Sequence, residues 1–342
     1  RREPLMKIRG LTKEFKIKSR KLGAKPQILH ALSDVSLDVY EGETLGIIGE
    51  SGCGKSTLGR TIIQLHKATA GTVEYQGRNI FELKGAELKA LKKDIQMVFQ
   101  DPYSSLDPRN TCEDIIAEPL KVHNIITDPK ARQERVLELM REVGLDIQHM
   151  NRYPHEFSGG QRQRINVARA LALKPKIIVC DEPVSALDVS IQAQVLNLFN
   201  RLQRQHNLTY IFISHDLGVI KHVSDRIAIM YLGRVVELCR AAQIYENPLH
   251  PYTKALLSAI PLPVVGKDKP KRQLIKGESP LSRKRNALCL RARFPALSAI
   301  RSAVPWRAAA PTAPNAAPGK SRPCRTLATA IRWPVFCIIK TL

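Results

Sequence analysis

Strand-like runs of three to five residues, most of them apolar, recur between residues 37 and 230, separated by mostly polar stretches. The runs lie at 37–39, 45–48, 95–99, 177–180, 210–213 and 227–230. Several are continuously apolar, which is the pattern of parallel strands that are covered on both faces. We therefore predict strands at these positions.

Two segments between these runs place their apolar residues at helical spacing. One set is Val136, Leu139, Met140 and Val143, and the other is Val195, Leu198, Phe199 and Leu202. Gly144 follows the first set and is a residue that commonly ends a helix. Strands that alternate with helices predict an α/β fold across residues 5–262. Residues 101–160, rich in the helical pattern, are predicted to form a subdomain beside the sheet.

The composition changes after residue 262. Residues 263–276 are rich in proline and basic residues, and residues 279–342 hold 12 of the 54 lysines and arginines and no aspartate or glutamate. We place a domain boundary near residue 262 and expect residues 279–342 to be disordered. Because much of the net charge of +23 comes from this tail, charge alone favours no class of partner.

Composition narrows the class of protein further. The 342 residues are 44% hydrophobic and 25% charged, as in globular domains. No run approaches the roughly 18 uncharged apolar residues of a membrane-spanning helix, so we do not expect the chain to span a bilayer. The seven cysteines form no C-x-x-C pair, which favours reduced thiols over disulfides or a zinc site. Cys289, Cys324 and Cys337 lie far apart in the tail, and no role is predicted for them.

The sequence GESGCGKST at 49–57 follows the predicted strand 45–48 and matches the pattern G-x-x-x-x-G-K-[ST]. Its glycines allow a loop whose N–H groups face phosphate oxygens, and a helix beginning near Lys55 directs its positive dipole at the same anion. Lys55 is predicted to reach the β- and γ-phosphates, and Ser56 to hold Mg²⁺. A simple glycine-rich turn is the alternative, which the position between strand and helix disfavours. The predicted phosphate-binding residues are Gly49, Glu50, Ser51, Gly52, Cys53, Gly54, Lys55, Ser56 and Thr57.

Two acids end the apolar run 177–180. Ligands of open α/β sheets bind outside the carboxyl ends of the strands, where Asp181 and Glu182 would lie. We predict that Asp181 contacts Mg²⁺, through water, and that Glu182 is the general base that polarises the attacking water. Solvated loop acids are the alternative, because such pairs are common, but the upstream phosphate loop favours the catalytic interpretation.

A second anion-binding helix start is predicted at 157–161, FSGGQ. Ser158 is a suitable helix N-cap, and Gly159 and Gly160 leave backbone N–H groups exposed before Gln161. One ATP does not need two such cradles from the same chain. We therefore expect this turn to contact the γ-phosphate of ATP held by another subunit; an ordinary capped helix is the alternative.

The phosphate loop, the acid pair and the 157–161 turn together resemble the motifs of the ABC ATPases. Phe157 stands where that family usually has leucine, while the serine and glycines that contact phosphate are intact. The resemblance implies a P-loop NTPase fold with a RecA-like core sheet, an antiparallel β subdomain and a helical signature subdomain. It also implies ATP and Mg²⁺ as cofactors and ATP hydrolysis as the reaction.

The same resemblance assigns roles to four further residues. Gln100, after the predicted strand 95–99, corresponds to the glutamine that senses Mg²⁺ and the attacking water, and His215 to the histidine that contacts the γ-phosphate. Asp188 belongs to the stretch 185–188, which resembles the family's loop that passes between the two ATP-binding subunits. Phe15 lies where the family stacks an aromatic ring on adenine, and a place in the core is its alternative.

Longer segments narrow the resemblance to the oligopeptide/dipeptide importers. These segments are QDPYSSLDPR at 100–109, YPHEFSGGQRQRI at 153–165 and HPYTKALLSAIP at 250–261, and nickel, glutathione and opine importers share them. The resemblance covers residues 5–278, so 5–262 is the predicted nucleotide-binding domain and 263–278 the start of the subfamily's C-terminal extension. For residues 279–342 our hypothesis is a shifted reading frame; a disordered basic arm and a folded module are the alternatives.

The resemblance also implies partners and a location. Two ATP-binding subunits, in this subfamily often different proteins, sandwich two ATP molecules. A groove around Gln100 and residues 103–109 receives a short helix from one of two transmembrane permease subunits. An extracytoplasmic substrate-binding protein takes part indirectly. The chain would then lie at the cytoplasmic face of the plasma membrane, with no nucleic acid as a partner.

Three other functions compete with peptide import. They are a soluble ABC ATPase that acts on DNA or ribosomes, the ATPase of an exporter or another importer class, and a binding module without activity. The chain carries one cassette with a short 101–160 region and no zinc module, which disfavours the first. The segments at 100–109 and 250–261 disfavour the second, and the unaltered catalytic positions disfavour the third.

Overall fold

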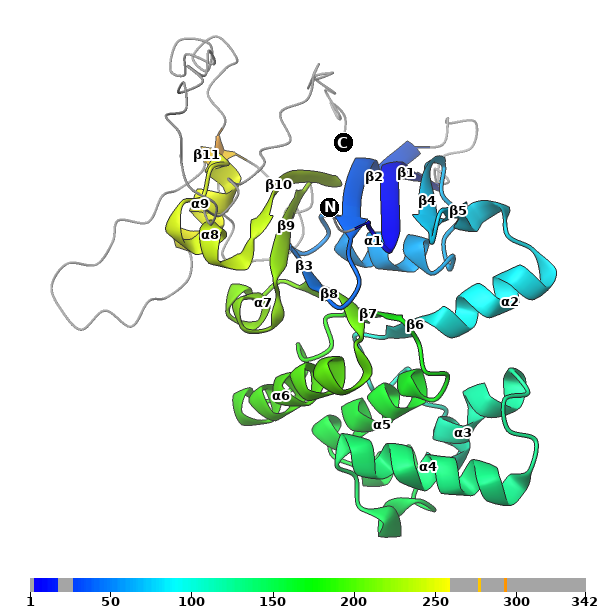
Figure 1. Ribbon diagram of the computed structural model, residues 1–342. Helices are drawn as coiled ribbons and strands as arrows, with labels where there is room; N and C mark the ends of the chain where they lie inside the picture. The colour runs from blue at the N-terminus through cyan, green and yellow to red at the C-terminus, as the bar shows by residue number, and fades with distance from the viewer. Residues whose placement is uncertain (1–2, 18–26, 259–275, 278–291, 294–342) are drawn as a thin grey trace, which may run out of the picture.

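The computed structural model in Figure 1 describes residues 3–17, 27–258, 276–277 and 292–293. Its larger sheet has six strands, in the order β10 (Arg234–Arg240), β9 (Arg226–Tyr231), β3 (Thr44–Ile48), β8 (Thr209–Ser214), β7 (Ile177–Asp181) and β6 (Ile95–Val98). The smaller sheet has the order β2 (Gln27–Val39), β1 (Met6–Ile17), β4 (Ala70–Tyr75) and β5 (Arg78–Asn79). β11 (Lys276–Gly277) pairs with β12 (Ala292–Arg293).

Parallel pairing joins five strands of the larger sheet. β6 pairs with β7, β7 with β8, β8 with β3 and β3 with β9, all in parallel, whereas β10 is antiparallel to β9. Five of the six predicted apolar runs lie in these parallel strands, and the run 37–39 ends β2. The strand predictions are therefore confirmed: the bounds of the five runs in parallel strands differ by one or two residues, whereas the run 37–39 is only the end of the longer β2.

Residues of the parallel strands are buried alternately in two separate cores. Tyr210 and Phe212 of β8 belong to one hydrophobic cluster, and Ile211 and Ile213 to the other. Every residue of β3, β7 and β8 is buried. Because successive side chains of a strand point to opposite faces, a strand covered on both faces is apolar throughout, as the sequence pattern indicates.

The smaller sheet covers one face of the larger one. Met6 and Ile8 of β1 and Leu37 of β2 share a cluster with Leu45 and Ile47 of β3. Helix α1 (Lys55–Ile62) contributes Leu58 and Ile62 to the same cluster. This antiparallel sheet lies against the loop that leaves β3, since Gly54 of the loop packs closely against Ala31 of β2.

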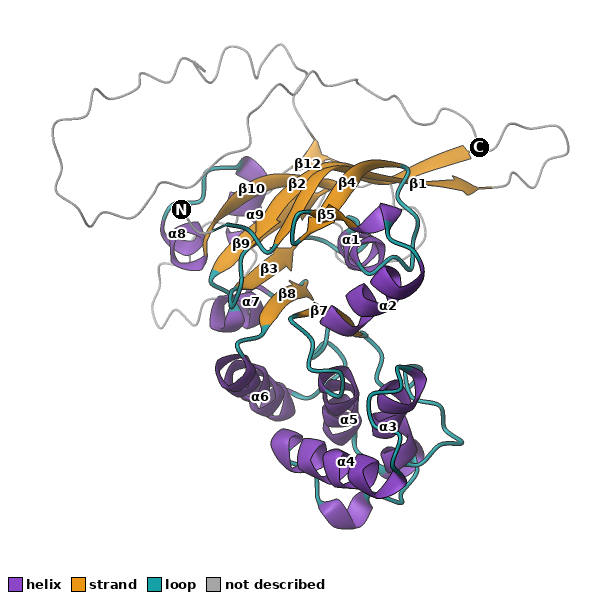
Figure 2. Ribbon diagram, turned by 45° about the vertical axis from the view of Figure 1, so that its right-hand side comes forward, coloured by secondary structure: helices purple, strands orange, loops and turns teal. Residues whose placement is uncertain are grey.

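Helices build the other hydrophobic cluster and lie below the sheets in Figure 2. They are α3 (Cys112–Val122), α4 (Pro129–Val143), α5 (Gly159–Leu171), α6 (Val189–His206) and α7 (Leu217–Val223). Phe199 of α6 packs edge to face against Tyr210 and Phe212, with ring centroids 5.5 Å and 5.6 Å apart. The predicted apolar faces of α4 and α6 are buried, and Gly144 ends α4 with φ of 71°.

The remaining helices lie at the edges of the fold. They are α2 (Gly85–Asp94), α8 (Ala241–Glu246), α9 (Pro251–Ser258) and short 3-10 helices at Ile80–Glu82, Ile147–His149 and Pro154–Glu156. No helix in the described ranges combines the length and apolarity needed to cross a bilayer. The predicted boundary near residue 262 and, apart from β11 and β12, the segments 263–278 and 279–342 lie outside the described residues.

Candidate active site

The loop between β3 and α1 is a tight backbone turn that only glycine fits at two positions. Gly52 has φ of 81° and Gly54 has φ of 107°, both in the left-handed region that L side chains rarely adopt. A Cβ on Gly54 would also lie 2.3 Å from the backbone oxygen of Ala31 in β2. Helix α1 begins at Lys55, as predicted, so its N-terminus faces the loop.

Lys55 lies inside this loop, where it is 4% exposed. Its Nζ donates hydrogen bonds to the backbone oxygens of Gly49 at 2.7 Å and Glu50 at 2.9 Å, and lies 3.9 Å from Cys53 Sγ. Burial raises the pKa of the Cys53 thiol, which keeps it uncharged. No carboxylate in the described part of the chain pairs with Lys55. The ammonium therefore holds two neutral carbonyls and can turn to an anion without breaking an ion pair.

Gly49→Ala is expected to destabilise the protein by about 2–3 kcal/mol, because the new methyl group would overpack the loop. Its Cβ would lie 2.2 Å from the backbone oxygen of Met230 and 2.7 Å from Cys53 Sγ. Gly85→Ala is the control, with φ of 54° and no atom within 4 Å of the added Cβ; it should cost about 1 kcal/mol from backbone strain alone. Urea denaturation measures both, and equal losses would contradict the steric argument.

Asp181 carries an oxygen whose hydrogen-bonding capacity is unused. Ser56 Oγ donates to Asp181 Oδ1 at 2.7 Å, whereas Oδ2 is buried and accepts no hydrogen bond from the residues that the structure describes. Arg60 Nη2 lies 3.7 Å from Oδ2. Burial raises the pKa of Asp181, and the Ser56 hydrogen bond partly offsets that rise. A buried carboxylate oxygen beside a hydroxyl is the donor set that Mg²⁺ prefers, so these residues fit the ion.

Glu182 contacts residues that follow the two strands beside its own. Its Oε2 accepts a hydrogen bond from Gln100 Nε2 at 2.9 Å and lies 3.1 Å from His215 Nδ1. These residues follow β6, β7 and β8, three neighbours in the parallel sheet. Glu182 has φ of 46°, and its N–H bonds to the oxygen of Ile213 at 2.9 Å. This left-handed backbone conformation bends the chain at Glu182, directly after β7. The Glu182 side chain there contacts Gln100 and His215.

The 157–161 turn has the predicted capped form and lies on the surface. Ser158 N donates to Gln161 Oε1 at 3.0 Å, and Gln161 N donates to Ser158 Oγ at 3.3 Å, which is a capping box. A Cβ on Gly160 would lie 2.4 Å from Ile191 Cγ2, so glycine permits close packing against α6. Within the described ranges, the turn makes no hydrogen bond to the 49–57 loop of the same chain.

Asp188 and Phe15 lie apart from the cluster around Glu182. Asp188 is exposed at the start of α6, and the next residue, Val189, is 82% exposed. Phe15 is half-buried in β1 and belongs to neither hydrophobic cluster, which disfavours its alternative as a core residue. Its ring lies edge-on to His66, with 5.4 Å between centroids, and below Lys13 Nζ at 4.8 Å.

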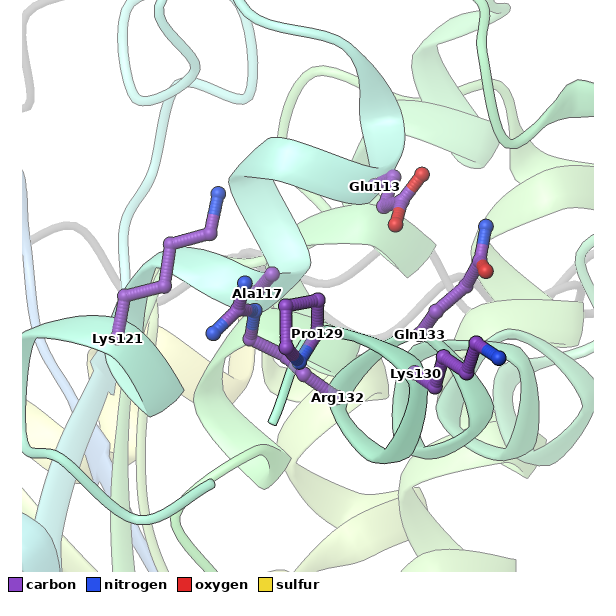
Figure 3. A pocket seen from close by; sticks show the side chains of 7 residues that line it. All are labelled: Glu113, Ala117, Lys121, Pro129, Lys130, Arg132 and Gln133. Carbon is purple, nitrogen blue, oxygen red and sulfur yellow. The ribbon is translucent and has the colours of Figure 1, made fainter. Parts of the chain in front are cut away.

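A separate cavity lies between α3 and α4, in the helical part of the chain. Figure 3 shows the side chains around this space of about 190 Å³, which are Glu113, Ala117, Lys121, Pro129, Lys130, Arg132 and Gln133. None of them is a predicted site residue. The cavity is therefore distinct from the phosphate loop and from the acids that face it.

Comparison of the sequence with known protein families shows the family of this chain. Residues 32–185 match the family model described as ABC transporter, and residues 236–292 match the oligopeptide/dipeptide transporter C-terminal region. The oligopeptide transport ATP-binding protein OppF of Escherichia coli is 54% identical over 282 residues, which are 82% of this chain and 84% of OppF. The chain belongs to the family of ABC transporter ATP-binding proteins. It is thus an ABC ATPase, and the fold and reaction implied by the sequence motifs are confirmed.

Another relative of this ABC ATPase and a solved structure support the same family assignment. OppF of Bacillus subtilis is 59% identical over 234 residues, which are 68% of this chain and 77% of that protein. Among solved structures, the dimeric post-hydrolysis state of the cassette MJ0796 bound to ADP and Pi has a TM-score of 0.62 at 32% identity. That match covers 69% of this chain and 98% of MJ0796.

Two residues at the site were not singled out from the sequence. Arg60, on the turn of α1 after Ser56, approaches Asp181. Tyr252 accepts a hydrogen bond from the backbone N–H of Glu50 at 3.1 Å, although it lies about 200 positions later in the chain. Arg60 could be anticipated from its position one helical turn from Ser56. Tyr252 was noted only as part of the subfamily segment 250–261, which carries no local signal of contact with the loop.

Proposed function

We propose that this ABC ATPase powers the import of oligopeptides or dipeptides as the ATP-hydrolysing subunit of a membrane transporter. The observation that carries catalysis is that Gln100 Nε2 donates a hydrogen bond to Glu182 Oε2 and that His215 Nδ1 lies 3.1 Å from the same oxygen. The peptide cargo rests on the names of relatives and on the match at residues 236–292. A glutathione import ATP-binding protein of Pectobacterium atrosepticum is 50% identical over 260 residues, but only 42% of that protein is covered.

In this proposal the two acids at the end of β7 have different roles in hydrolysis: Glu182 acts on the attacking water, and Asp181 on the metal ion. Glu182 holds the attacking water and accepts its proton, with its side chain oriented by Gln100 and His215. Lys55 turns from the loop carbonyls to the β- and γ-phosphates. Ser56 and Asp181, with Gln100, would hold Mg²⁺, which would supply neutralisation of the charge on the phosphate oxygens. Phe15 supplies an aromatic surface for adenine.

The second half of each composite site comes from a partner ATPase. Ser158 is exposed and the turn does not reach its own phosphate loop, so its side chain and the backbone N–H groups of Gly159 and Gly160, which the capping box leaves unused, are available to the γ-phosphate of ATP on another subunit. Asp188 is exposed, and its neighbour Leu187 lies against the turn, since a Cβ on Gly159 would be 3.2 Å from Leu187 Cδ2. MJ0796, which resembles this chain, forms a dimer. In the proposed transporter the partner is a different ATPase of the same family.

The groove around Gln100 and residues 103–109 is the proposed docking site of a permease helix. Tyr103 is 63% exposed, and its ring lies 3.8 Å from the guanidinium carbon of Arg162 on α5. Asn166 bonds to Ser105 Oγ at 2.9 Å, and Arg169 Nη1 donates to the Ser105 oxygen at 2.9 Å. Helix α5 thus joins the ATP-facing turn at its N-terminus to this segment. Two permeases and, indirectly, a substrate-binding protein complete the assembly at the cytoplasmic face of the membrane.

Ser158→Glu is expected to lower the ATP-dependent dimer population at least about tenfold, because a carboxylate would meet the γ-phosphate in place of a hydroxyl. The dimer is measured by light scattering with Mg-ATP and the partner ATPase, in chains that also carry Glu182→Gln to block hydrolysis. Thr127→Glu adds the same charge at an exposed position on the helical side, and should leave the dimer unchanged. Undiminished dimer in Ser158→Glu would contradict the composite site.

The cargo is tested in the complete complex. The chain is purified with its permease pair and partner ATPase, and ATP hydrolysis is measured with the substrate-binding protein and a mixture of di- to pentapeptides. Stimulation by peptides supports the proposal. Stimulation by nickel or by glutathione, without a response to peptides, would assign the transporter to one of the related importer groups instead.

A further inference from the structure

We infer that Tyr252 is a positioning residue for the phosphate loop, and that a buried network on Glu237 holds it there. The inference deepens the proposed function, on which it rests, because it assigns a role in nucleotide binding to the subfamily's C-terminal region. Tyr252 and Glu237 both lie in residues 236–292, which match that region, whereas the loop lies in residues 32–185, which match the ATPase cassette.

The Tyr252 side chain reaches the loop from helix α9. The residue is 6% exposed, and its hydroxyl accepts the hydrogen bond from Glu50 N at 3.1 Å. Its ring packs against that of Tyr231, with centroids 4.4 Å apart and planes tilted by 40°. Tyr231 ends β9, next to Met230, whose backbone oxygen lies against Gly49. The Tyr252 hydroxyl therefore contacts the loop on the side where β9 is already packed closely against it.

Glu237 fixes the start of α9. It is fully buried, and its carboxylate accepts hydrogen bonds from Leu249 N at 3.0 Å, His250 N at 2.9 Å and Thr253 Oγ1 at 2.6 Å. His250 Nδ1 in turn accepts a hydrogen bond from Tyr252 N at 3.1 Å. A buried carboxylate is stable only when it is hydrogen-bonded, so these bonds hold the HPYT segment in one position on β10.

One peptide group of the loop is held from both sides. The group between Gly49 and Glu50 offers its C=O to Lys55 Nζ at 2.7 Å and its N–H to Tyr252 Oη at 3.1 Å. In a trans peptide these two groups point in opposite directions, so bonds at both ends resist rotation of the whole unit. If the hydroxyl is removed, the Lys55 bond alone holds the group, and the loop loses part of its preorganisation for phosphate.

The test compares Tyr252→Phe with Tyr75→Phe in the full chain. Tyr75 is also 6% exposed and also uses its hydroxyl, which donates to Asp94 at 2.8 Å, but it lies in β4 away from the phosphate loop. Mg-ATP affinity is measured by calorimetry, and KM and kcat in the assembled transporter. Tyr252→Phe is expected to raise Kd and KM for ATP about 3- to 10-fold with kcat within twofold, as for one lost neutral hydrogen bond. Tyr75→Phe should leave Kd and KM unchanged even if it lowers Tm.

Amide hydrogen exchange gives a second, local measure. The Glu50 amide is expected to exchange several-fold faster in Tyr252→Phe than in the unmodified chain, and at an unchanged rate in Tyr75→Phe. If Tyr252→Phe matches the unmodified chain in both ATP affinity and Glu50 exchange, the positioning role is wrong while the proposed function stands. If the unmodified chain with its partners neither binds nor hydrolyses ATP, the proposed function fails, and this inference fails with it.

Discussion

Glu182→Gln is expected to lower ATP turnover by about 10²–10⁴-fold while ATP binding is preserved, because the amide cannot accept the proton of the attacking water. The substitution keeps the size of the side chain and one oxygen acceptor. Gln100 and His215, which lie 2.9 Å and 3.1 Å from Oε2, therefore retain a partner. Since the phosphate loop is untouched, the nucleotide should bind as before.

The measurement is single-turnover hydrolysis in the assembled transporter, with Mg-ATP affinity determined in parallel. Glu142→Gln is the matched control, because the Glu142 side chain of α4 is also largely buried, 26% exposed against 11% for Glu182, and also lies near a histidine, His206, at 3.3 Å. The control should hydrolyse ATP normally. Near-normal turnover in Glu182→Gln would refute the assignment of the base. Loss of ATP binding in that variant would show that Glu182 acts on the nucleotide site as a whole.

Lys55→Met is expected to weaken ATP binding about 100-fold. The ammonium contributes charge-assisted hydrogen bonds to phosphate, each worth roughly 1.5–3 kcal/mol, and methionine keeps most of the apolar stem while removing the charge. The same change leaves the carbonyls of Gly49 and Glu50 without their shared donor. Both effects act on the ground state, so the loss should appear in Kd.

Calorimetry with Mg-ATP measures this loss in the full chain. Lys121→Met is the control, because Lys121 is half-exposed, forms an ion pair with Asp114 at 3.0 Å and lies on α3. It should bind ATP normally. An unchanged Kd for Lys55→Met would show that Lys55 only closes the empty loop and does not contact phosphate. Glu182→Gln and Lys55→Met are complementary, since the first is expected to affect turnover and the second binding.

Local sequence determined a large part of this architecture. The strand at 177–180 was predictable because a strand covered on both faces must be apolar at every position, and α4 because its apolar face has helical spacing and ends at Gly144. The loop at 49–57 was predictable because its glycines and Lys55 are required at fixed positions in one turn. The long strands β1 and β2 were not predicted in full, since their exposed outer parts lack a continuous apolar run.

Only the tertiary structure shows which residues of these segments contact one another. The order of β6, β7 and β8 in the sheet brings Gln100 and His215 to Glu182, and no spacing along the chain encodes that order. Tyr252 meets Glu50 only because β9 and β10 return the chain beside β3 and Glu237 anchors the start of α9. Periodicity and turn chemistry are local properties, whereas these contacts depend on strand order and on buried polar groups finding partners far along the chain.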